Sequence, residues 1–341
     1  MLNLTPPFNK GAAEPPPQYR CNARNLFKVA ELALVRNIRS PADRRRMSTE
    51  TPERLGIGMK IDTSSEDLQV EDISYHQHQA GALLARIYRP RAQAPRSALV
   101  SVHGGRWTRE TRLTNAPIDE ALAHDGNVVM AIDFRMPPVA RYPDCMADIN
   151  LAVRWLKQYA AELGIGAHRV GGIGTSSGGH QLMLCAMRPK DPRYAKLQLP
   201  GGPDLDAALG FAIMGWPVLD PLARYEMAKA KGMSEHVAAH DAYWPTVEAM
   251  AEGNPQLILE RAESTALPPA LLVQGAADTI LPPDMAGNFA TAFRKAGGTL
   301  DLRMFDGQPH TFITKDPISA ASIAAIDLIK LFVRYRTALL T

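Results

Sequence analysis

A serine lies at the centre of the pentapeptide Gly174-Thr175-Ser176-Ser177-Gly178, a pattern that can hold a hydroxyl group ready for nucleophilic attack. An apolar run precedes the pentapeptide and an apolar helical pattern follows it, which predicts a sharp turn from strand to helix. Small residues two positions away on each side let such a turn close, and Ser176 has glycine on both flanks whereas Ser177 does not. We therefore predict that Ser176 is a nucleophile.

Two phosphate-binding interpretations of the same stretch are excluded by its residues. A P-loop needs a lysine after its last glycine, and His180 and Gln181 stand there instead. A dinucleotide fingerprint that begins at Gly172 would need its third glycine at position 177, which is Ser177. Covalent chemistry at a serine remains the better interpretation.

A weakly nucleophilic serine needs a base, and the base needs a carboxylate that orients it. His310 and Asp278 each follow a predicted strand, in the loop at its carboxyl end. The chain order Ser176, Asp278, His310 is also one in which the members of known catalytic triads occur. Asp306 and Asp284 are the rival acids, and Asp306 is the less suitable because a turn residue more often bonds its own backbone.

Backbone donors for an oxyanion are expected where the segment His103-Gly104-Gly105-Arg106-Trp107 follows a predicted strand, and directly after the nucleophile. The predicted oxyanion hole consists of Gly104, Gly105, Arg106 and Ser177. His103 and His180 are expected to have structural roles. The side chain of Arg106 is either a partner for a substrate carboxylate or a surface arginine, and the sequence leaves both open.

Short apolar runs that alternate with longer helical patterns must position these residues, and they indicate a mostly parallel sheet with helices on both faces. Two strands, near 68–76 and 82–89, predict a hairpin at the start. Further strands are predicted at 98–102, 128–134, 169–174, 208–214, 270–274 and 300–305. Sites in such sheets lie at the carboxyl ends of the strands, which is where the candidate residues occur.

Two helices have clear signals at their ends. Apolar residues at spacings of three and four from Met146 to Leu163 predict a helix that stops near Gly164. Asp316 followed by Pro317 predicts the N-cap of a last helix that runs to about Thr337.

The chain divides into two predicted parts. Residues 1–65 are predicted to form a proline-rich arm and a basic cap helix, and residues 66–341 a catalytic domain. A connection of about 45 residues is unusually long, so residues 220–266 are predicted to be a helical cap insertion. Trp107, Trp216 and Trp244 are predicted to contact the substrate, although aromatic residues in a core would give the same pattern.

Composition excludes several classes of protein. The chain of 341 residues is 46% hydrophobic and 21% charged with a net charge of +3, which favours a globular protein without a nucleic-acid partner. No apolar run reaches the roughly 18 residues of a spanning helix, so no stable membrane association is expected. Cys21, Cys145 and Cys185 lack metal-ligand spacing and are expected to be thiols. The absence of a signal-peptide pattern favours the cytoplasm, and a homodimer is left open.

Together these residues resemble the α/β-hydrolases, and within them the hormone-sensitive-lipase-like carboxylesterase group, over about residues 68–338. Members of that group typically read HGGG, DYRLAPE and GDSAGG where this chain has HGGR at 103–106, DFRMPP at 133–138 and GTSSGG at 174–179. Gly-Gly followed by a large residue and Trp is similar to the kynurenine formamidase and feruloyl-esterase-like branches. The resemblance implies an α/β-hydrolase fold with about eight strands and a helical cap.

The expected function is a serine esterase that cleaves a carboxylic ester of a small apolar or aromatic substrate through an acyl-enzyme, without a cofactor or metal. An amide or formamide hydrolase is the first alternative, because of the Gly105-Arg106-Trp107 segment. A non-catalytic member of the fold that binds a small molecule is the second, and the presence of candidates for all three triad roles argues against it.

Overall fold

The computed structural model describes residues 65–199 and 204–338. The arm and the basic helix that the sequence predicts within residues 1–65 lie outside the described residues, apart from Ser65, and so does Cys21.

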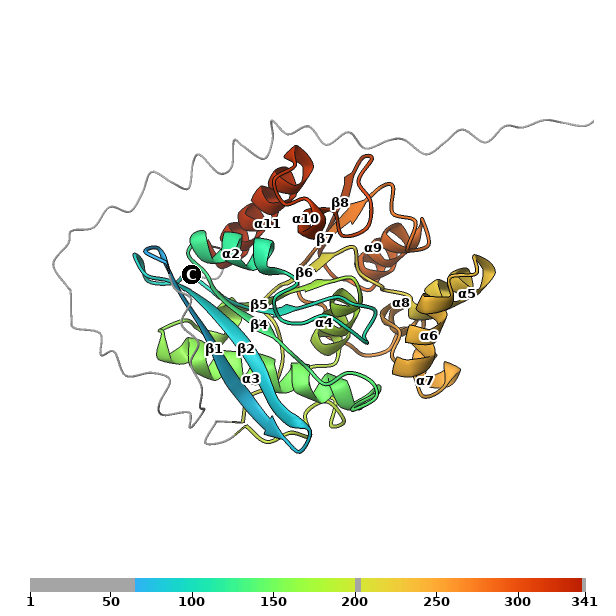
Figure 1. The fold of residues 1–341 in the computed structure, drawn as a ribbon, viewed down its shortest axis with the longest axis horizontal. Coiled ribbons are helices and arrows are strands. Elements are labelled where there is room, and N and C mark those ends of the chain that lie inside the picture. The colour runs from blue at the N-terminus through green and yellow to red at the C-terminus, as the bar shows by residue number, and fades with distance from the viewer. Residues whose placement is uncertain (1–64, 200–203, 339–341) are drawn as a thin grey trace, which may run out of the picture. The chain divides into compact units, whose positions relative to one another are not determined.

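Eight strands form one mixed sheet in the order β1-β2-β4-β3-β5-β6-β7-β8 (Figure 1). β1 and β2 form the predicted antiparallel hairpin and β2 pairs antiparallel with β4, whereas the pairs from β4 to β8 are all parallel. The strands are β1 (Leu68–His78), β2 (Gly81–Pro90), β3 (Ala98–Val102), β4 (Val128–Ile132), β5 (Val170–Thr175), β6 (Ala212–Gly215), β7 (Ala270–Gly275) and β8 (Leu300–Phe305). The predicted fold class, a mostly parallel sheet of about eight strands, is confirmed.

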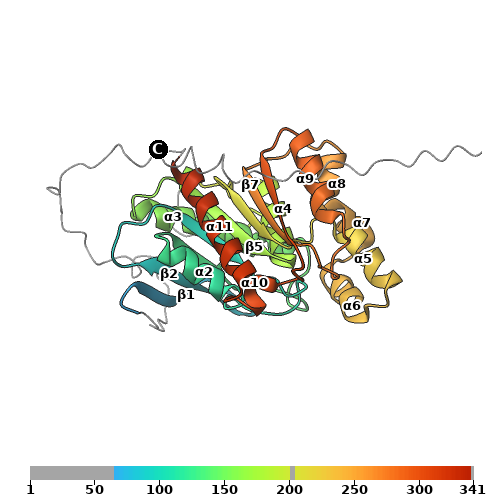
Figure 2. The ribbon, with the colours of Figure 1, turned by 90° about the horizontal axis from the view of Figure 1, so that it is seen from above.

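Helices cover both faces of the sheet because alternate residues of the strands point to opposite sides (Figure 2). Val100 and Met130 belong to the core on the side of α3, α4, α8 and α9, whereas Leu99 and Val129 belong to the core on the side of α2, α10 and α11. These helices are α2 (Ala116–His124), α3 (Asp144–Glu162), α4 (Ser177–Met187), α8 (Pro255–Glu260), α9 (Met285–Lys295), α10 (Phe312–Lys315) and α11 (Ala320–Ala338). In the part of the chain that is described, no helix is long and apolar enough to cross a membrane.

The start of β6 differs from the sequence prediction, which placed it at residue 208. The strand begins at Ala212, because the segment before it crosses close to the chain at the start of β5. Gly210 donates its N–H to the carbonyl of Val170, and a Cβ on Gly210 would overlap the carbonyl oxygen of His168. The chain therefore aligns with the sheet only after this crossing.

The helix ends agree with the sequence at α3 and differ at α11. α3 ends at Glu162, and Gly164 follows with a φ of 74°, as expected of a stop. The predicted N-cap at Asp316 is wrong, because Asp316 instead ends the short helix α10. The hydroxyl of Ser319 accepts a hydrogen bond from the N–H of Ser322, so α11 begins at Ala320.

Four helices occupy the long connection between β6 and β7. They are α5 (Pro221–Ala230), α6 (Ser234–Tyr243), α7 (Val247–Glu252) and α8. Hydrogen bonds join this connection to the segment before α3: Tyr142 donates its N–H to the carbonyl of Tyr243, and Arg141 donates to the carbonyl of Ala242. The region predicted as an insertion is thus helical and attached at the carboxyl side of the sheet.

Candidate active site

Ser176 lies on the sharp turn between β5 and α4 with φ 51° and ψ −121°, a conformation that costs energy for a residue with a side chain. The backbone holds it there, since its N–H donates to the carbonyl of Gly215 and its carbonyl accepts from the N–H of Val218. A Cβ on Gly174 would press on the carbonyl of Gly178, and a Cβ on Gly178 would overlap the carbonyl of His103. This is the steric reason for the two small flanking residues.

The structure brings the three predicted triad residues together. The hydroxyl of Ser176 lies 2.9 Å from Nε2 of His310, and Nδ1 of His310 lies 2.7 Å from Oδ2 of Asp278. With the Nδ1–H tautomer, His310 donates to the carboxylate and leaves Nε2 free to accept the serine proton. The three groups come from the ends of β5, β7 and β8.

The hydrogen bonds around Asp278 stabilise its carboxylate in the ionised form, as a partner for His310. Its Oδ1 accepts hydrogen bonds from the N–H groups of Ile280 and Leu281, and its Oδ2 accepts from the amide of Gln274. Burial by itself would raise the pKa of Asp278, but the hydrogen bonds from His310 and Gln274 outweigh it and hold that pKa below its ordinary value. The sequence analysis did not identify Gln274.

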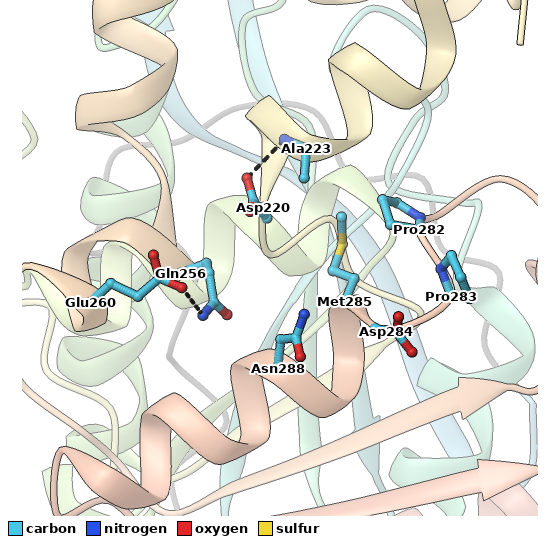
Figure 3. Close-up of a pocket in the computed structure, with 9 residues that line it drawn as sticks. All are labelled: Asp220, Ala223, Gln256, Glu260, Pro282, Pro283, Asp284, Met285 and Asn288. Atoms are coloured by element: carbon cyan, nitrogen blue, oxygen red, sulfur yellow. Dashed lines mark hydrogen bonds between the residues drawn. The ribbon is translucent and has the colours of Figure 1, made fainter. Parts of the chain in front are cut away.

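The rival acids are not bonded to the histidine in the described residues. Asp284 precedes α9 and lines a pocket of about 190 Å³ between α5, α8 and α9 (Figure 3). Asp220 and Glu260 line the same pocket, where they bond to the N–H of Ala223 and the amide of Gln256. None of the three triad residues lines it.

The loop after β3 has the strained backbone expected of a loop that presents N–H groups to a ligand. Arg106 and Trp107 have φ values of 58° and 63°, and Gly105 has a φ of 108°. Gly104 packs so closely that a Cβ there would lie 3.0 Å from Cβ of Ser176. Within residues 65–199 and 204–338, the N–H groups of Gly105 and Arg106 have no protein acceptor.

Ser177 connects this loop to the turn of the nucleophile. Its hydroxyl accepts the N–H of Trp107 at 3.1 Å, and its own N–H, at the first position of α4, has no partner within the helix. The N–H groups predicted for the oxyanion hole are thus held next to Ser176.

Asn115 is a second linking residue, and the sequence analysis missed it. Its side chain donates to the hydroxyl of Ser101 and to the carbonyl of Val102, and it accepts from the hydroxyl of Thr175. It therefore fastens the end of β3 to the end of β5, directly before the two functional loops. An isolated asparagine before a predicted helix gives no signal for this role.

The predicted substrate contacts of the tryptophans are not supported. Trp107 is fully buried and stacks on Tyr243, and Trp244 packs edge-on against both. Trp216 is also fully buried, with its ring centroid 6.4 Å from that of His310. All three side chains are core residues with almost no surface left for a ligand, which is the alternative that the sequence left open.

Two buried histidines hold the helices α5–α8 in place: His180 bonds this group to the rest of the site, and His240 bonds α6 to α5. Trp107 donates its indole N–H to Nδ1 of His180, whose Nε2 donates to the carbonyl of Gly253. Arg224 donates to Nδ1 of His240, whose Nε2 lies 3.1 Å from the carbonyl of Pro221. Burial lowers the pKa of His180 to about 4 and that of His240 to about 3, so both rings are neutral.

His103 and the side chain of Arg106 also have defined partners. His103 stacks on Phe134, and burial lowers its pKa, which suits the structural role expected of it. The guanidinium of Arg106 forms an ion pair of 2.8 Å with Glu235 of α6. Among the described residues, no group of three or more His, Cys, Asp or Glu side chains is arranged to hold a metal ion.

Comparison with known proteins gives a consistent picture. A family model described as BD-FAE matches residues 86–214. Esterase LipC of Mycobacterium tuberculosis is 28% identical over 203 residues, which are 59% of this chain and 49% of LipC. This chain thus spans about half the length of LipC. The ethyl acetate hydrolase of Pseudomonas putida is 28% identical over 255 residues, which are 72% of this chain and 76% of that protein.

Solved structures agree with these matches. Esterase 2 of Thermogutta terrifontis with bound propionate superposes with a TM-score of 0.63 at 26% identity, covering 79% of this chain and 94% of that one. The same esterase phosphorylated by paraoxon superposes with a TM-score of 0.61 at 25% identity, with the same coverage.

Proposed function

Because the chain belongs to the α/β-hydrolase superfamily, we propose that it is a serine carboxylesterase that uses Ser176 as nucleophile, His310 as base and Asp278 as orienting acid. The observation that carries the proposal is the continuous hydrogen-bond chain from Ser176 through His310 to Asp278. The esterase names of its relatives support the same reaction class.

Acylation begins when the Ser176 oxygen attacks the ester carbonyl while Nε2 of His310 accepts the hydroxyl proton. The electron pair of the carbonyl moves onto its oxygen, where the N–H groups of Gly105, Arg106 and Ser177 stabilise the charge. Each such donor contributes roughly 10²–10³ in rate. When the tetrahedral intermediate collapses, His310 gives its proton to the departing alcohol, and the acyl group remains on Ser176.

Deacylation repeats these steps with water as the nucleophile. His310 accepts a proton from water as the hydroxide oxygen bonds to the acyl carbon, and it then returns the proton to the Ser176 oxygen. Throughout, the carboxylate of Asp278 fixes the Nδ1–H tautomer and stabilises the imidazolium. The products are the carboxylic acid and the alcohol.

The substrate class that we propose is a small ester. Support comes from the relatives: one is an ethyl acetate hydrolase, and the T. terrifontis esterase has structures with propionate and with butyrate bound.

We further propose that α5–α8 form a cap over the carboxyl end of the sheet, since α6 contacts the loop after β3 through Arg106 and Glu235. The free buried thiols Cys145 and Cys185 suit the cytoplasm, which cell fractionation would test.

Labelling with paraoxon tests the nucleophile directly. We expect one diethylphosphoryl group per chain, located on Ser176 by peptide mass spectrometry, together with loss of 4-nitrophenyl butyrate hydrolysis. The matched control is Ser176→Ala, which should take up no label although Ser177 is still present. Labelling of another serine, or full activity after labelling, would refute the proposal.

A further inference from the structure

Arg224 on α5 is a buried guanidinium without a carboxylate partner in the described part of the chain. Its side chain is only 1% exposed, and its Nε has no hydrogen-bond partner there. The neutral ring of His240, which accepts from Nη1, offers no compensating charge. A charge removed from water is costly unless an opposite charge lies near it, and Arg224 forms no ion pair; its charge is offset only by the ring of Trp107 under the guanidinium and by the carboxylate of Asp278, which does not bond to it.

This charge lies beside the proposed active site. Cζ of Arg224 is 5.8 Å from the ring centroid of Trp107, and Trp107 directly follows Arg106 in the loop that is bonded to Ser177. Burial lowers the pKa of Arg224 to about 10, and the positive charge of Arg106 acts in the same direction, whereas the carboxylate of Asp278 opposes it. The two guanidinium groups are therefore close enough to repel each other.

Of the two guanidinium groups, that of Arg106 is the one that a ligand can reach. Its side chain is 14% exposed, and its counter-ion Glu235 is 76% exposed. In the described part of the chain, the carboxylate of Glu235 accepts its side-chain hydrogen bond from Arg106. An ion pair with so exposed a partner is weak, and another carboxylate can replace it.

The side chains around the ion pair of Arg106 and Glu235 are mostly cationic on the side that faces Arg224. Burial lowers the pKa of His236 to about 4, and the positive charges of Arg224 and Arg106 act in the same direction, whereas Glu235 opposes them. One exposed carboxylate, Glu235, thus faces cationic side chains from the loop after β3 and from α5. Such an excess of positive charge next to a nucleophile favours an anionic ligand.

We propose that Arg106 binds a carboxylate of the substrate in place of Glu235, that the buried charge of Arg224 supports this binding, and that the preferred esters are therefore anionic. The inference rests on the proposed esterase function and adds the charge of the substrate to it. The planar guanidinium suits this role because it can bind a carboxylate through two parallel hydrogen bonds.

Two pairs of esters that differ only in this charge test the proposal. Mono-4-nitrophenyl glutarate and its methyl ester carry or lack a carboxylate on the acyl side, and 4-acetoxybenzoate and its methyl ester do so on the alcohol side. For one of the pairs, the wild-type kcat/KM of the charged ester should exceed that of the neutral ester by about 10- to 100-fold, the range of a desolvated charge-assisted hydrogen bond.

Four variants assign the effect to residues. Arg106→Asn, whose new side chain tolerates the left-handed backbone, and Arg224→Gln, which can still bond to His240, should each lower the charged-to-neutral ratio at least 10-fold. Glu235→Gln removes the competing carboxylate and should raise the ratio about threefold by lowering KM for the charged ester alone. Lys229→Gln, on the same helix as Arg224 and paired with Glu226, should change neither activity nor ratio.

The outcomes separate this inference from the function on which it rests. If esters are hydrolysed but the ratio is near one, or is the same in Arg106→Asn and Glu235→Gln as in the wild type, the inference is wrong and the esterase function stands. If no ester is hydrolysed, both are wrong. If Arg224→Gln does not fold, the opposite shifts expected of Arg106→Asn and Glu235→Gln still decide the matter.

Discussion

Gly178 lies in contact with the backbone of His103, so that α4 begins directly against the loop whose N–H groups we propose as donors to an oxyanion. A Cβ on Gly178 would overlap the carbonyl oxygens of His103 and Val102, neither of which can move without shifting β3. We expect Gly178→Ala to lower the free energy of unfolding by about 3 kcal/mol or more and to abolish activity. Urea denaturation of purified protein measures the first effect. Gly287→Ala is the control: its Cβ meets no atom within 4 Å on α9, so stability should rise by up to about 1 kcal/mol.

Replacement of Asp278 by asparagine should leave the fold in place and remove the orientation of His310. An amide cannot hold the Nδ1–H tautomer as the carboxylate does, and such a change in a serine protease triad costs about 10⁴ in kcat. We expect a comparable loss for Asp278→Asn with 4-nitrophenyl butyrate. Asp284→Asn, at the pocket between α5, α8 and α9, should remain within about threefold of the wild type. If the two variants lost activity equally, Asp278 would not be the orienting acid.

The two serines of the turn should differ sharply in their variants. Ser176→Ala removes the nucleophile and should reduce kcat by about 10⁴–10⁶. Ser177→Ala removes only the acceptor of the Trp107 N–H, so the oxyanion loop becomes less well held and kcat should fall by about 3- to 30-fold at similar KM. Active-site titration of Ser177→Ala with paraoxon checks that its residual activity belongs to intact protein. An inactive Ser177→Ala beside an active Ser176→Ala would reverse the two roles.

Acid should destabilise the protein through its buried neutral histidines. The folded pKa of His180 is about 4 and an unfolded histidine has a pKa near 6.5, so the unfolded state binds more protons between these values and stability falls as the pH falls. From pH 7 to pH 5, His180 alone should reduce the free energy of unfolding by about 2 kcal/mol. Urea denaturation at both pH values should show a smaller difference for His180→Gln. The exposed His124→Gln should keep the wild-type difference.

Asp119 on α2 should lower the stability of the protein as the pH rises, which is the opposite of the effect of the buried histidines. Both of its carboxyl oxygens are buried without a hydrogen bond of ordinary geometry in the described residues, and burial raises its pKa well above the ordinary value, although the nearby hydroxyl of Ser101 acts in the opposite direction. Above pH 4 the unfolded state therefore ionises more readily than the folded state, and stability declines as the pH rises toward the folded pKa. Asp119→Asn should raise the free energy of unfolding at pH 8 by about 1–3 kcal/mol. An equal gain in the exposed neighbour Glu120→Gln would contradict this explanation.

The positions of the strands along the chain and the meeting of Ser176, Asp278 and His310 could be predicted because their signals are local. Each residue follows an apolar run that forms a strand, and parallel strands bring their carboxyl ends to one edge. The small residues around Ser176 have a steric cause that can be read from the sequence alone. For the same reason the hairpin, β3 and β8 were predicted to within two residues.

Residues whose roles depend on distant packing could not be assigned. Trp107 and Trp244 are core residues because α6 and α7 pack against the oxyanion loop, more than 100 positions away from it in the chain. Arg224 is buried with its Nε unpaired among the described residues, and no pattern of residue types reveals that. The start of α11 was wrong because Ser319 bonds the first turn and the preceding Asp-Pro signal falls in the turn after α10.

Helices α5–α8 leave the sheet after β6 and rejoin it at β7 as one uninterrupted tract, while serine, base and acid all come from outside that tract. If α5–α8 form the proposed cap, mutation or recombination within residues 220–266 would alter which esters are accepted without rebuilding the proposed triad. Such a division would make selectivity the more evolvable property of the proposed esterase, and bond cleavage the more conservative one.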